Sequence, residues 1–417
     1  MNQVPIKHID SDVIDKHAVK TMLERRIPDF TLEQAFYNSP EIFRIDMEEI
    51  FGKEWIFAGM TCEFPKRGSF TTLDVGGNPI IIVRDNKDQI RAFHNVCRHR
   101  GSKICTTQKG KSAKLVCPYH QWTYDLDGSL VFAGVDMGDD FDKSLYSLHP
   151  VHCENAGGYI FVCLADTPPP IQEFLDDLNH YLEPYDMANT KVAYESTIIE
   201  KANWKLVVEN NRECYHCDGS HPELLHTLLE WDDNNDPRAT PEFIALVEKQ
   251  QKLWSGHDIP FKFKGAYGLR NRMVRTPLKE GTHAMTMDGK AASKKLMGRI
   301  DTPDLGVLRI LHLPNSWNHG GGDNLIAFQI LPVSPQETKV ITRWIVHKDA
   351  VEGVDYDVEN LIHVWIATNA QDRTLAETNQ LGVNSKAYQP GPYSKTYEFG
   401  VINFVNWYCE QLEANLG

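Results

Sequence analysis

The spacing of apolar and polar positions divides the 417-residue chain into three parts. The first part, residues 1–55, is predicted to be mainly helical. Ser39 is typical of a helix N-cap and Pro40 of a first helical turn, and apolar residues then recur at helical spacing until Gly52. This pattern predicts an N-terminal helical segment.

The second part, residues 56–166, contains short strands. Residues 70–75 mix apolar and polar positions, and residues 79–83 form a continuous apolar run after the turn Gly76-Gly77-Asn78. This pattern predicts an antiparallel hairpin. Proline-rich residues 167–170 then interrupt the pattern. We therefore expect a small all-β domain that ends at this linker.

The third part, residues 167–417, mixes helices with strands. Residues 202–215 have helical spacing, and residues 357–380 predict a long helix without an internal proline. Two alternating runs, 323–331 and 339–347, are joined by a segment with two prolines and predict an antiparallel hairpin. This segregation favours an α+β domain in which helices pack on an antiparallel sheet in a helix-grip-like arrangement.

Charge and composition limit the function classes. The chain has 43 Lys and Arg against 57 Asp and Glu, a formal net charge of −14, which disfavours nucleic acid and anionic membrane surfaces as partners. No apolar run reaches the roughly 18–20 residues of a membrane helix, and the N-terminus has no signal-peptide pattern. We therefore expect a cytoplasmic protein. Its nine cysteines are too sparse for a disulfide scaffold and raise the question of metal binding.

Two cysteine–histidine pairs form the first candidate site. Cys97-Arg-His99 and Cys117-Pro-Tyr-His120 each offer one thiolate and one imidazole on a short segment. Two histidines replace two cysteines on one iron of a Rieske 2Fe-2S cluster, and this substitution raises the reduction potential. A structural zinc site is the alternative, because two cysteines and two histidines also bind zinc. The interleaved order of the residues favours the iron–sulfur cluster.

A second candidate site begins with His216 and His221. On an uninterrupted helix these two residues would point apart, but Gly219 permits a bend and Pro222 moves His221 out of helical geometry. Two histidines and one carboxylate make up the facial triad of a mononuclear non-haem iron(II) site, with open positions for oxygen.

Asp372 is the candidate third ligand. It lies in the predicted helix 357–380 at a position of the apolar stripe, where a buried carboxylate needs a partner. The alternative is an aspartate paired with an arginine or exposed near the end of the helix. The pattern alone leaves both interpretations open.

The motifs around these residues resemble those of Rieske non-haem iron oxygenases. Cys97-Arg-His-Arg-Gly and Cys117-Pro-Tyr-His-Gln-Trp-Thr-Tyr-Asp-Leu-Asp-Gly look like the Rieske motif of the ring-hydroxylating and demethylating oxygenases, and Asn369-Ala-Gln-Asp-Arg looks like the helix that supplies their third iron ligand. The resemblance implies a Rieske domain over 56–166 and a catalytic domain over 167–417. It implies cluster ligands Cys97, His99, Cys117 and His120, and iron ligands His216, His221 and Asp372.

Glu213 places the chain near one branch of this family. Most members have aspartate three residues before the first iron-ligating histidine, whereas glutamate resembles the branch that acts on quaternary ammonium compounds. This branch includes carnitine oxygenases, stachydrine demethylases and glycine betaine demethylases, and residues 210–217 look most similar to the last. The resemblance implies an oxygenase component that uses O2 to convert glycine betaine into dimethylglycine and formaldehyde.

Several alternatives stay open from the sequence. Within the family they are a stachydrine, carnitine or choline-type oxygenase and the alpha subunit of an aromatic-ring-hydroxylating dioxygenase. Outside this reaction class they are a binding protein with structural zinc and a protein that only transfers electrons.

The resemblance also implies partners. The chain would form a homotrimer in which the cluster of one subunit faces the iron of its neighbour, and Glu213 would connect His216 to a cluster histidine, His120 or His99, of that neighbour. The chain has no dinucleotide-binding fingerprint and no second cysteine cluster. We therefore expect a separate reductase with flavin and a 2Fe-2S cluster that oxidises NADH or NADPH.

Two features of the sequence have ordinary structural alternatives. Cys214 and Cys217 have the spacing of a redox dithiol, but their context favours two small buried cysteines. Four aromatic residues are candidates for holding a trimethylammonium group by cation–π attraction, although ordinary core positions are favoured for each: Trp231, Trp254, Tyr267 and Trp317. No residue stands out as the partner of a substrate carboxylate.

Overall fold

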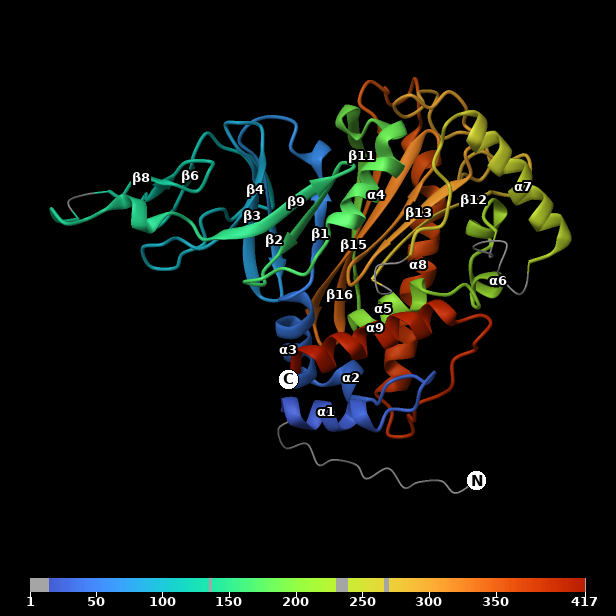
Figure 1. Ribbon diagram of the computed structural model, residues 1–417, viewed down its shortest axis with the longest axis horizontal. Helices are drawn as coiled ribbons and strands as arrows, with labels where there is room; N and C mark the ends of the chain where they lie inside the picture. The colour runs from blue at the N-terminus through green and yellow to red at the C-terminus, as the bar shows by residue number, and fades with distance from the viewer. Residues whose placement is uncertain (1–14, 135–136, 230–238, 266–269, 417) are drawn as a thin grey trace.

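The computed structural model of the protein describes residues 15–134, 137–229, 239–265 and 270–416. It has two lobes, with strands β6 (Leu115–Val116) and β8 (Leu130–Phe132) at the tip of one and helix α7 (Pro241–Gly256) at the outer side of the other (Figure 1). In these described ranges, we find no helix with the length and apolar character needed to cross a bilayer.

The N-terminal segment is helical, as predicted. Its helices are α1 (Lys16–Glu24), α2 (Ala35–Asn38) and α3 (Pro40–Asp46), and a π-helical turn over Met47–Phe51 continues α3. The hydroxyl of Ser39 accepts hydrogen bonds from the backbone N–H groups of Glu41 and Ile42 at 3.1 and 3.2 Å. The predicted N-cap at Ser39 is therefore confirmed.

The first lobe is built on a seven-stranded antiparallel sheet with the order β1-β10-β9-β4-β3-β2-β5. A second, three-stranded sheet, β6-β7-β8, forms its tip (Figure 1). The predicted hairpin is present as β2 and β3, joined through Gly76 and Gly77 at φ 58° and 82°. The remaining bounds are β1 (Ile56–Met60), β2 (Ser69–Val75), β3 (Asn78–Arg84), β4 (Ile90–His94), β5 (Lys109–Lys111), β7 (Thr123–Tyr124), β9 (Pro150–Ala156) and β10 (Tyr159–Cys163).

The second lobe is built on a six-stranded antiparallel sheet with the order β11-β16-β15-β14-β13-β12. Its strands are β11 (Thr190–Glu200), β12 (Asn271–Thr276), β13 (Val307–His312), β14 (Ser316–Gly320), β15 (Asn324–Ser334) and β16 (Glu337–His347). Its helices, besides α7, are α4 (Gln172–Leu182), α5 (Trp204–Asn211), α6 (Cys217–Ser220), α8 (Val358–Val383) and α9 (Phe399–Leu416). The predicted α+β class with an antiparallel sheet is confirmed.

Two predicted boundaries in this lobe are wrong. The hairpin of β15 and β16 is longer than expected, because Pro332 pairs with Thr338 and the strands run nearly to the turn. Helix α5 ends at Asn211, four residues before the predicted end, and Arg212 is its C-cap. The long helix α8 begins and ends close to its predicted bounds.

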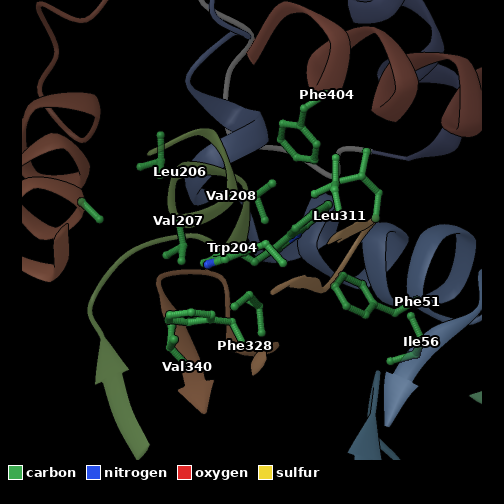
Figure 2. Close-up of a cluster of buried hydrophobic side chains, with 14 of the residues drawn as sticks. Phe51, Ile56, Trp204, Leu206, Val207, Val208, Leu311, Phe328, Val340 and Phe404 are labelled. Carbon is green, nitrogen blue, oxygen red and sulfur yellow. The ribbon is translucent and has the colours of Figure 1, made fainter. Parts of the chain in front are cut away.

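A shared apolar core joins the N-terminal helices to the second lobe. The indole of Trp204 at the start of α5 is fully buried and meets the ring of Phe51 edge-on, with centroids 5.1 Å apart. Figure 2 shows Trp204 among Phe51, Phe328 and Phe404, which come from three other parts of the chain. The N-terminal segment therefore packs as part of the lobe that carries α5.

Hydrogen bonds fasten the first lobe to the sheet of the second. The backbone N–H of Phe57 donates to Asn315 Oδ1 at 2.9 Å, and Asn315 Nδ2 and Gln329 Nε2 each donate to the Phe57 carbonyl at 2.9 Å. The buried imidazole of His312 contacts the Trp55 carbonyl through Nε2 at 2.7 Å. Burial lowers the pKa of His312 to about 3, so this ring is neutral.

A buried ion pair holds α5 against α3. Lys205 Nζ donates to Asp46 Oδ2, and both side chains are fully buried. The Asp46 carboxylate also accepts from Trp204 Nε1 at 3.0 Å and from the Tyr408 hydroxyl at 2.7 Å. Since every oxygen of the carboxylate has a partner, the pair satisfies the condition for a buried charge.

We predict that Lys205→Met lowers the free energy of unfolding by about 3–5 kcal/mol, because the substitution leaves the buried Asp46 charge without its cation. Equilibrium urea unfolding measures the change. Arg67→Met removes an exposed partner of Asp88 and should leave the unfolding midpoint unchanged. Equal midpoints for Lys205→Met and the parent protein would contradict the prediction.

Candidate metal centres

One helical turn brings His216 and His221 together. His216 is the N-cap of α6 and His221 its C-cap, and their Nε2 atoms lie 2.9 Å apart. The predicted bend at Gly219 is wrong, because Gly219 lies inside α6. The predicted effect of Pro222 is confirmed, since His221 before it leaves helical geometry at φ −125° and ψ 62°.

Asp372 of α8 reaches the same point from the other side. Its Oδ1 lies 3.0 Å from His221 Nε2 and 3.4 Å from His216 Nε2, and it accepts from Asn210 Nδ2 of α5 at 3.2 Å. The side chain is 30% exposed, so it faces a cavity and does not belong to the fully buried stripe of α8 that the sequence predicted. The three predicted ligands are therefore brought together.

Outer hydrogen bonds fix the direction of both imidazoles. Glu213 Oε1 accepts from His216 Nδ1 at 2.5 Å, and Gln371 Oε1 accepts from His221 Nδ1 at 2.8 Å. Gln371 is itself held by its Nε2, which donates to Glu223 Oε2 at 2.8 Å. With both Nδ1 atoms donating, each Nε2 lone pair is directed at the common point, as in known histidine–metal sites.

The electrostatics of this point favour a cation. Burial lowers the pKa of His216, but hydrogen bonds to Asp372 and Glu213 outweigh it and raise that pKa to about 9. Burial raises the pKa of Asp372, and its bonds to the two histidines outweigh burial and lower it. Two carboxylates thus favour positive charge where the two Nε2 atoms and Oδ1 meet, which fits a divalent metal.

The two cysteines beside this site are bonded to each other. Cys214 and Cys217 form a disulfide with a Cα–Cα distance of 4.9 Å, so the expectation of two small buried cysteines is wrong. Cys217 Sγ lies within 4.8 Å of the two histidine ligand atoms. Because a disulfide sulfur is not a thiolate, Asp372 is the better third ligand.

The four residues of the first candidate site also converge. The thiols of Cys97 and Cys117 are buried, and the rings of His99 and His120 have centroids 4.6 Å apart. The buried Nδ1 of His99 has no hydrogen-bond partner in the described part of the chain. Burial raises the pKa of the Cys97 thiol beside Cys117. A buried imidazole nitrogen without a partner and two neighbouring buried thiols fit a metal cluster with these four ligands.

Neighbouring residues shape this cluster site. The Trp122 ring stacks on His99 with centroids 5.0 Å apart. The Tyr124 hydroxyl lies 3.3 Å from Cys97 Sγ. Gly128 has φ 87°, and a Cβ there would lie 2.5 Å from the Phe93 ring. The predicted turn at Gly128 is confirmed, and a larger side chain would disturb the wall behind the cluster ligands.

A cavity of about 140 Å³ opens onto His216, His221 and Asp372. This volume lies below the roughly 300–1,000 Å³ of pockets for drug-sized ligands, which favours a small substrate. Trp317 lines the cavity, whereas Trp254 is fully buried in a separate core cluster, so its candidacy for the wall is wrong. Trp231 and Tyr267 lie outside the described residues. Sequence reasoning missed Trp365, Arg272 and Arg309 in the cavity wall.

Sequence profiles match both parts of the chain. The Rieske [2Fe-2S] domain matches residues 54–133, and the catalytic domain of the ring-hydroxylating alpha subunit matches residues 187–414. The chain belongs to this family of Rieske oxygenases. It is therefore an oxidoreductase with a Rieske 2Fe-2S cluster and a mononuclear non-haem iron, and the structural zinc and electron-transfer-only alternatives are wrong.

Two curated relatives are similar over nearly the whole chain and a third over about half of it. The glycine betaine monooxygenase oxygenase subunit of Pseudomonas aeruginosa is 62% identical over 96% of this chain and 94% of its own length. That of Chromohalobacter salexigens is 59% identical over 96% and 90%. The carnitine monooxygenase oxygenase subunit of Acinetobacter pittii is 35% identical over 48% of this chain and 54% of its own length.

Solved structures of Rieske oxygenases have the same fold. A quaternary ammonium Rieske monooxygenase studied for carnitine oxidation gives a TM-score of 0.70 at 23% identity and covers 94% of this chain and 98% of its own. Naphthalene 1,2-dioxygenase from Rhodococcus gives 0.65 at 19% identity, over 96% and 98%. Both matches cover more than nine-tenths of this chain, so the likeness in fold extends over both lobes.

We predict that Gln371→Leu weakens iron binding by about 10–100-fold, because His221 loses the acceptor that orients its ring. Iron per subunit after dialysis against graded chelator measures the effect, and the visible absorption of the Rieske cluster reports that the first lobe is intact. His221→Ala should lose the mononuclear iron altogether and keep the cluster.

Thr374→Ala is the matched control, because Thr374 is exposed on the same helix and its hydroxyl donates to the Ala370 carbonyl of that helix at 2.9 Å. It should retain iron like the parent protein. Retention of iron by Gln371→Leu at every chelator concentration would contradict an orienting role for Gln371.

Proposed function

We propose that this chain is the oxygenase component of a monooxygenase that removes one methyl group from glycine betaine, yielding dimethylglycine and formaldehyde. The identity of 62% with a glycine betaine monooxygenase oxygenase subunit, extending over 96% of the chain, carries the proposal. The small cavity beside the candidate iron ligands supports it, since glycine betaine is a compact substrate.

We assign the cluster to Cys97, His99, Cys117 and His120, and the iron to His216, His221 and Asp372. Held by these residues, the cluster and the iron would supply the chemistry for activating O2: with two electrons from the reductase and two protons, one oxygen atom would enter a C–H bond and the other would leave as water. On an N-methyl group this insertion gives a hemiaminal, which breaks down to formaldehyde and the demethylated amine.

The protein residues position the reaction. Glu213 and Gln371 hold the two imidazoles, and Asn210 holds the Asp372 carboxylate. The buried rings of Trp317 and Trp365 cover part of the cavity and exclude water from the methyl group that reacts.

A homotrimer in which electrons cross between subunits suits the placement of the two sites. In one chain, β6 and β8 beside the cluster ligands lie at one end of the molecule, and α6 with the iron ligands lies at the other (Figure 1). Exposed aromatic side chains flank both sites, with Tyr119 55% and Tyr215 62% exposed. Contact between these surfaces on neighbouring subunits would bury both and shorten the electron path.

We further propose the division into an N-terminal helical segment over 1–55, a Rieske domain over 56–166 and a catalytic domain over 167–417. The electron donor is a separate reductase with flavin and a 2Fe-2S cluster that oxidises NADH or NADPH. Such a donor works where these nucleotides are present, so we place the enzyme in the cytoplasm.

We predict formaldehyde release from glycine betaine in a single turnover of the chemically reduced enzyme exposed to O2, with at most one formaldehyde per iron. Proline betaine, carnitine and choline, assayed alongside, should give less. His221→Ala is the control and should give none. Absence of formaldehyde from glycine betaine, or faster release from another compound of the panel, would refute the proposed substrate.

We predict that Glu213→Gln keeps the cluster and the iron but slows electron transfer between them. The amide has no negative charge with which to stabilise His216 as a hydrogen-bond donor, although its shape is unchanged. Rapid mixing of the reduced enzyme with O2 and substrate measures the rate of cluster oxidation. Cluster oxidation at the rate of the parent protein would exclude the bridging role.

A further inference from the structure

A disulfide spans the segment that carries the first iron ligand. Cys214 and Cys217 are bonded to each other and enclose Tyr215 and His216, whereas the other seven cysteines are free thiols. The bridge closes a very short ring, and a short ring restricts the unfolded chain less than a long one does. Stabilising the fold is therefore a poor explanation for this bridge.

Hydrogen bonds hold the same turn without the bridge. The backbone N–H of Cys217 donates to the Cys214 carbonyl at 3.3 Å. Glu213 Oε2 accepts from the backbone N–H groups of Tyr215 and His216, the latter at 3.4 Å. Because none of these bonds involves sulfur, the two cysteines remain neighbours when the S–S bond is broken. The bridge can thus open and form again in place.

Both cysteines border the cavity of the iron site. They line it together with the candidate ligands His216, His221 and Asp372. Cys214 is half-buried and Cys217 is buried, and Cys217 Sγ lies within 4.8 Å of a ring nitrogen of each histidine. A small molecule that enters or forms in the cavity therefore reaches this pair.

The cysteines outside the two candidate sites are poorly suited to redox chemistry. Burial raises the pKa of each of these thiols to about 11 or 12: Cys62, Cys105, Cys153, Cys163 and Cys409. They stay protonated near neutral pH, and a protonated thiol is a weak nucleophile. Oxidation is therefore expected at Cys214 and Cys217 and not at these positions.

Oxygen chemistry supplies an oxidant for such a pair. When O2 takes up two electrons and two protons without transferring an oxygen atom, the product is hydrogen peroxide. Peroxide oxidises a thiol to a sulfenic acid, which condenses with a neighbouring thiol to a disulfide. In the cytoplasm, where we place the enzyme, disulfides are rare, and those that form are usually catalytic or redox-sensing.

We propose that Cys214 and Cys217 are a redox pair that reduces hydrogen peroxide in the iron cavity and thereby protects His216 and His221 from oxidation. This inference goes beyond the proposed function and rests on its assignment of the iron to that cavity. The disulfide in the structure is the oxidised form of the pair.

The reaction consists of two balanced steps. The sulfur of Cys214, the more accessible of the two, attacks one peroxide oxygen; the O–O bond breaks, and a sulfenic acid and one water form. The sulfur of Cys217 then attacks the oxidised sulfur; the S–O bond breaks, and the disulfide and a second water form. The two thiols lose two electrons and two protons, and the peroxide gains them. A dithiol reductant restores the pair by exchange and becomes a disulfide itself.

The test is thiol mapping on the intact holoenzyme. The enzyme is treated with excess dithiol, freed of it, checked by visible absorption for an oxidised cluster, and exposed to one equivalent of hydrogen peroxide without O2. N-ethylmaleimide then blocks the remaining thiols, and peptide mass spectrometry counts them. The parent protein should form about one Cys214–Cys217 disulfide per peroxide. Cys105, which is half-buried as Cys214 is, should remain a thiol.

Single variants separate the two steps. In Cys217→Ser, peroxide should leave Cys214 as a sulfenic acid, which dimedone labels, and in Cys214→Ser the thiol of Cys217 should remain. Excess peroxide should convert more of His216 and His221 to oxohistidine in Cys214→Ser than in the parent protein. Cys105→Ser is the matched control and should behave like the parent protein. All three variants should retain the cluster spectrum and the iron content.

Three results would each overturn the proposal: a bridge that resists excess dithiol, a reduced pair that peroxide leaves as thiols, and equal histidine oxidation in Cys214→Ser and the parent protein. Formaldehyde release from glycine betaine is measured separately. If the pair reduces peroxide but no formaldehyde is released, the proposed reaction fails and the redox pair stands. If formaldehyde is released but the pair is inert, the redox pair alone fails.

Discussion

The meeting of two imidazoles and one carboxylate at a single point is the constraint on which the rest of the fold depends. His221 lies 150 residues before Gln371, the neighbour of Asp372 in α8. The three ligand atoms are nevertheless within 3.4 Å of one another. These short distances between the ligand atoms tolerate little movement, because a metal ligand displaced by an ångström no longer binds. The sheet and the helices must therefore hold α5 and α8 at one fixed spacing.

Charged groups buried under α5 provide that rigidity. Lys205 pairs with Asp46 at one end of the helix, and one turn later Glu209 accepts from the hydroxyls of Tyr37 at 2.9 Å and Tyr393 at 3.1 Å. Burial raises the pKa of Glu209 to about 7 and outweighs the two tyrosine hydrogen bonds, which lower it. A buried polar network of this kind is costly unless every member is satisfied, and it then specifies one arrangement. The partners come from the N-terminal helices and the C-terminal segment, and both chain ends thereby support the iron site.

How far the sequence predicted this arrangement depended on the range of each interaction. Local features could be predicted from the sequence because they depend on residues that are close together in the chain. They are the N-cap at Ser39, the turn at Gly76 and Gly77, and the spacing of the cysteine–histidine pairs. The position of Gln371 depends on its contact with His221, and that of Arg309 on its contact with the Leu229 carbonyl. Both partners are distant in the sequence, so no local pattern predicts these contacts. Trp254 and Trp317 differ for the same reason: the sequence shows two indoles, and only tertiary packing decides that one is core and the other lines the cavity.

The two metal centres differ in how they are covered, and this difference has a physical consequence. Buried thiols with Tyr124 and Trp122 around them enclose one side of the cluster site, whereas the half-buried His120 lies next to the exposed Tyr119. At the iron site, His221 is 1% exposed, but Glu213 and His216 are half-buried at the rim. At the cluster site the accessible ligand is His120, and at the iron site the accessible ligands are His216, 19% exposed, and Asp372, 30% exposed. In the proposed transfer between subunits, a histidine therefore lies at the accessible edge of each centre, and the one at the iron site, His216, is bonded to Glu213.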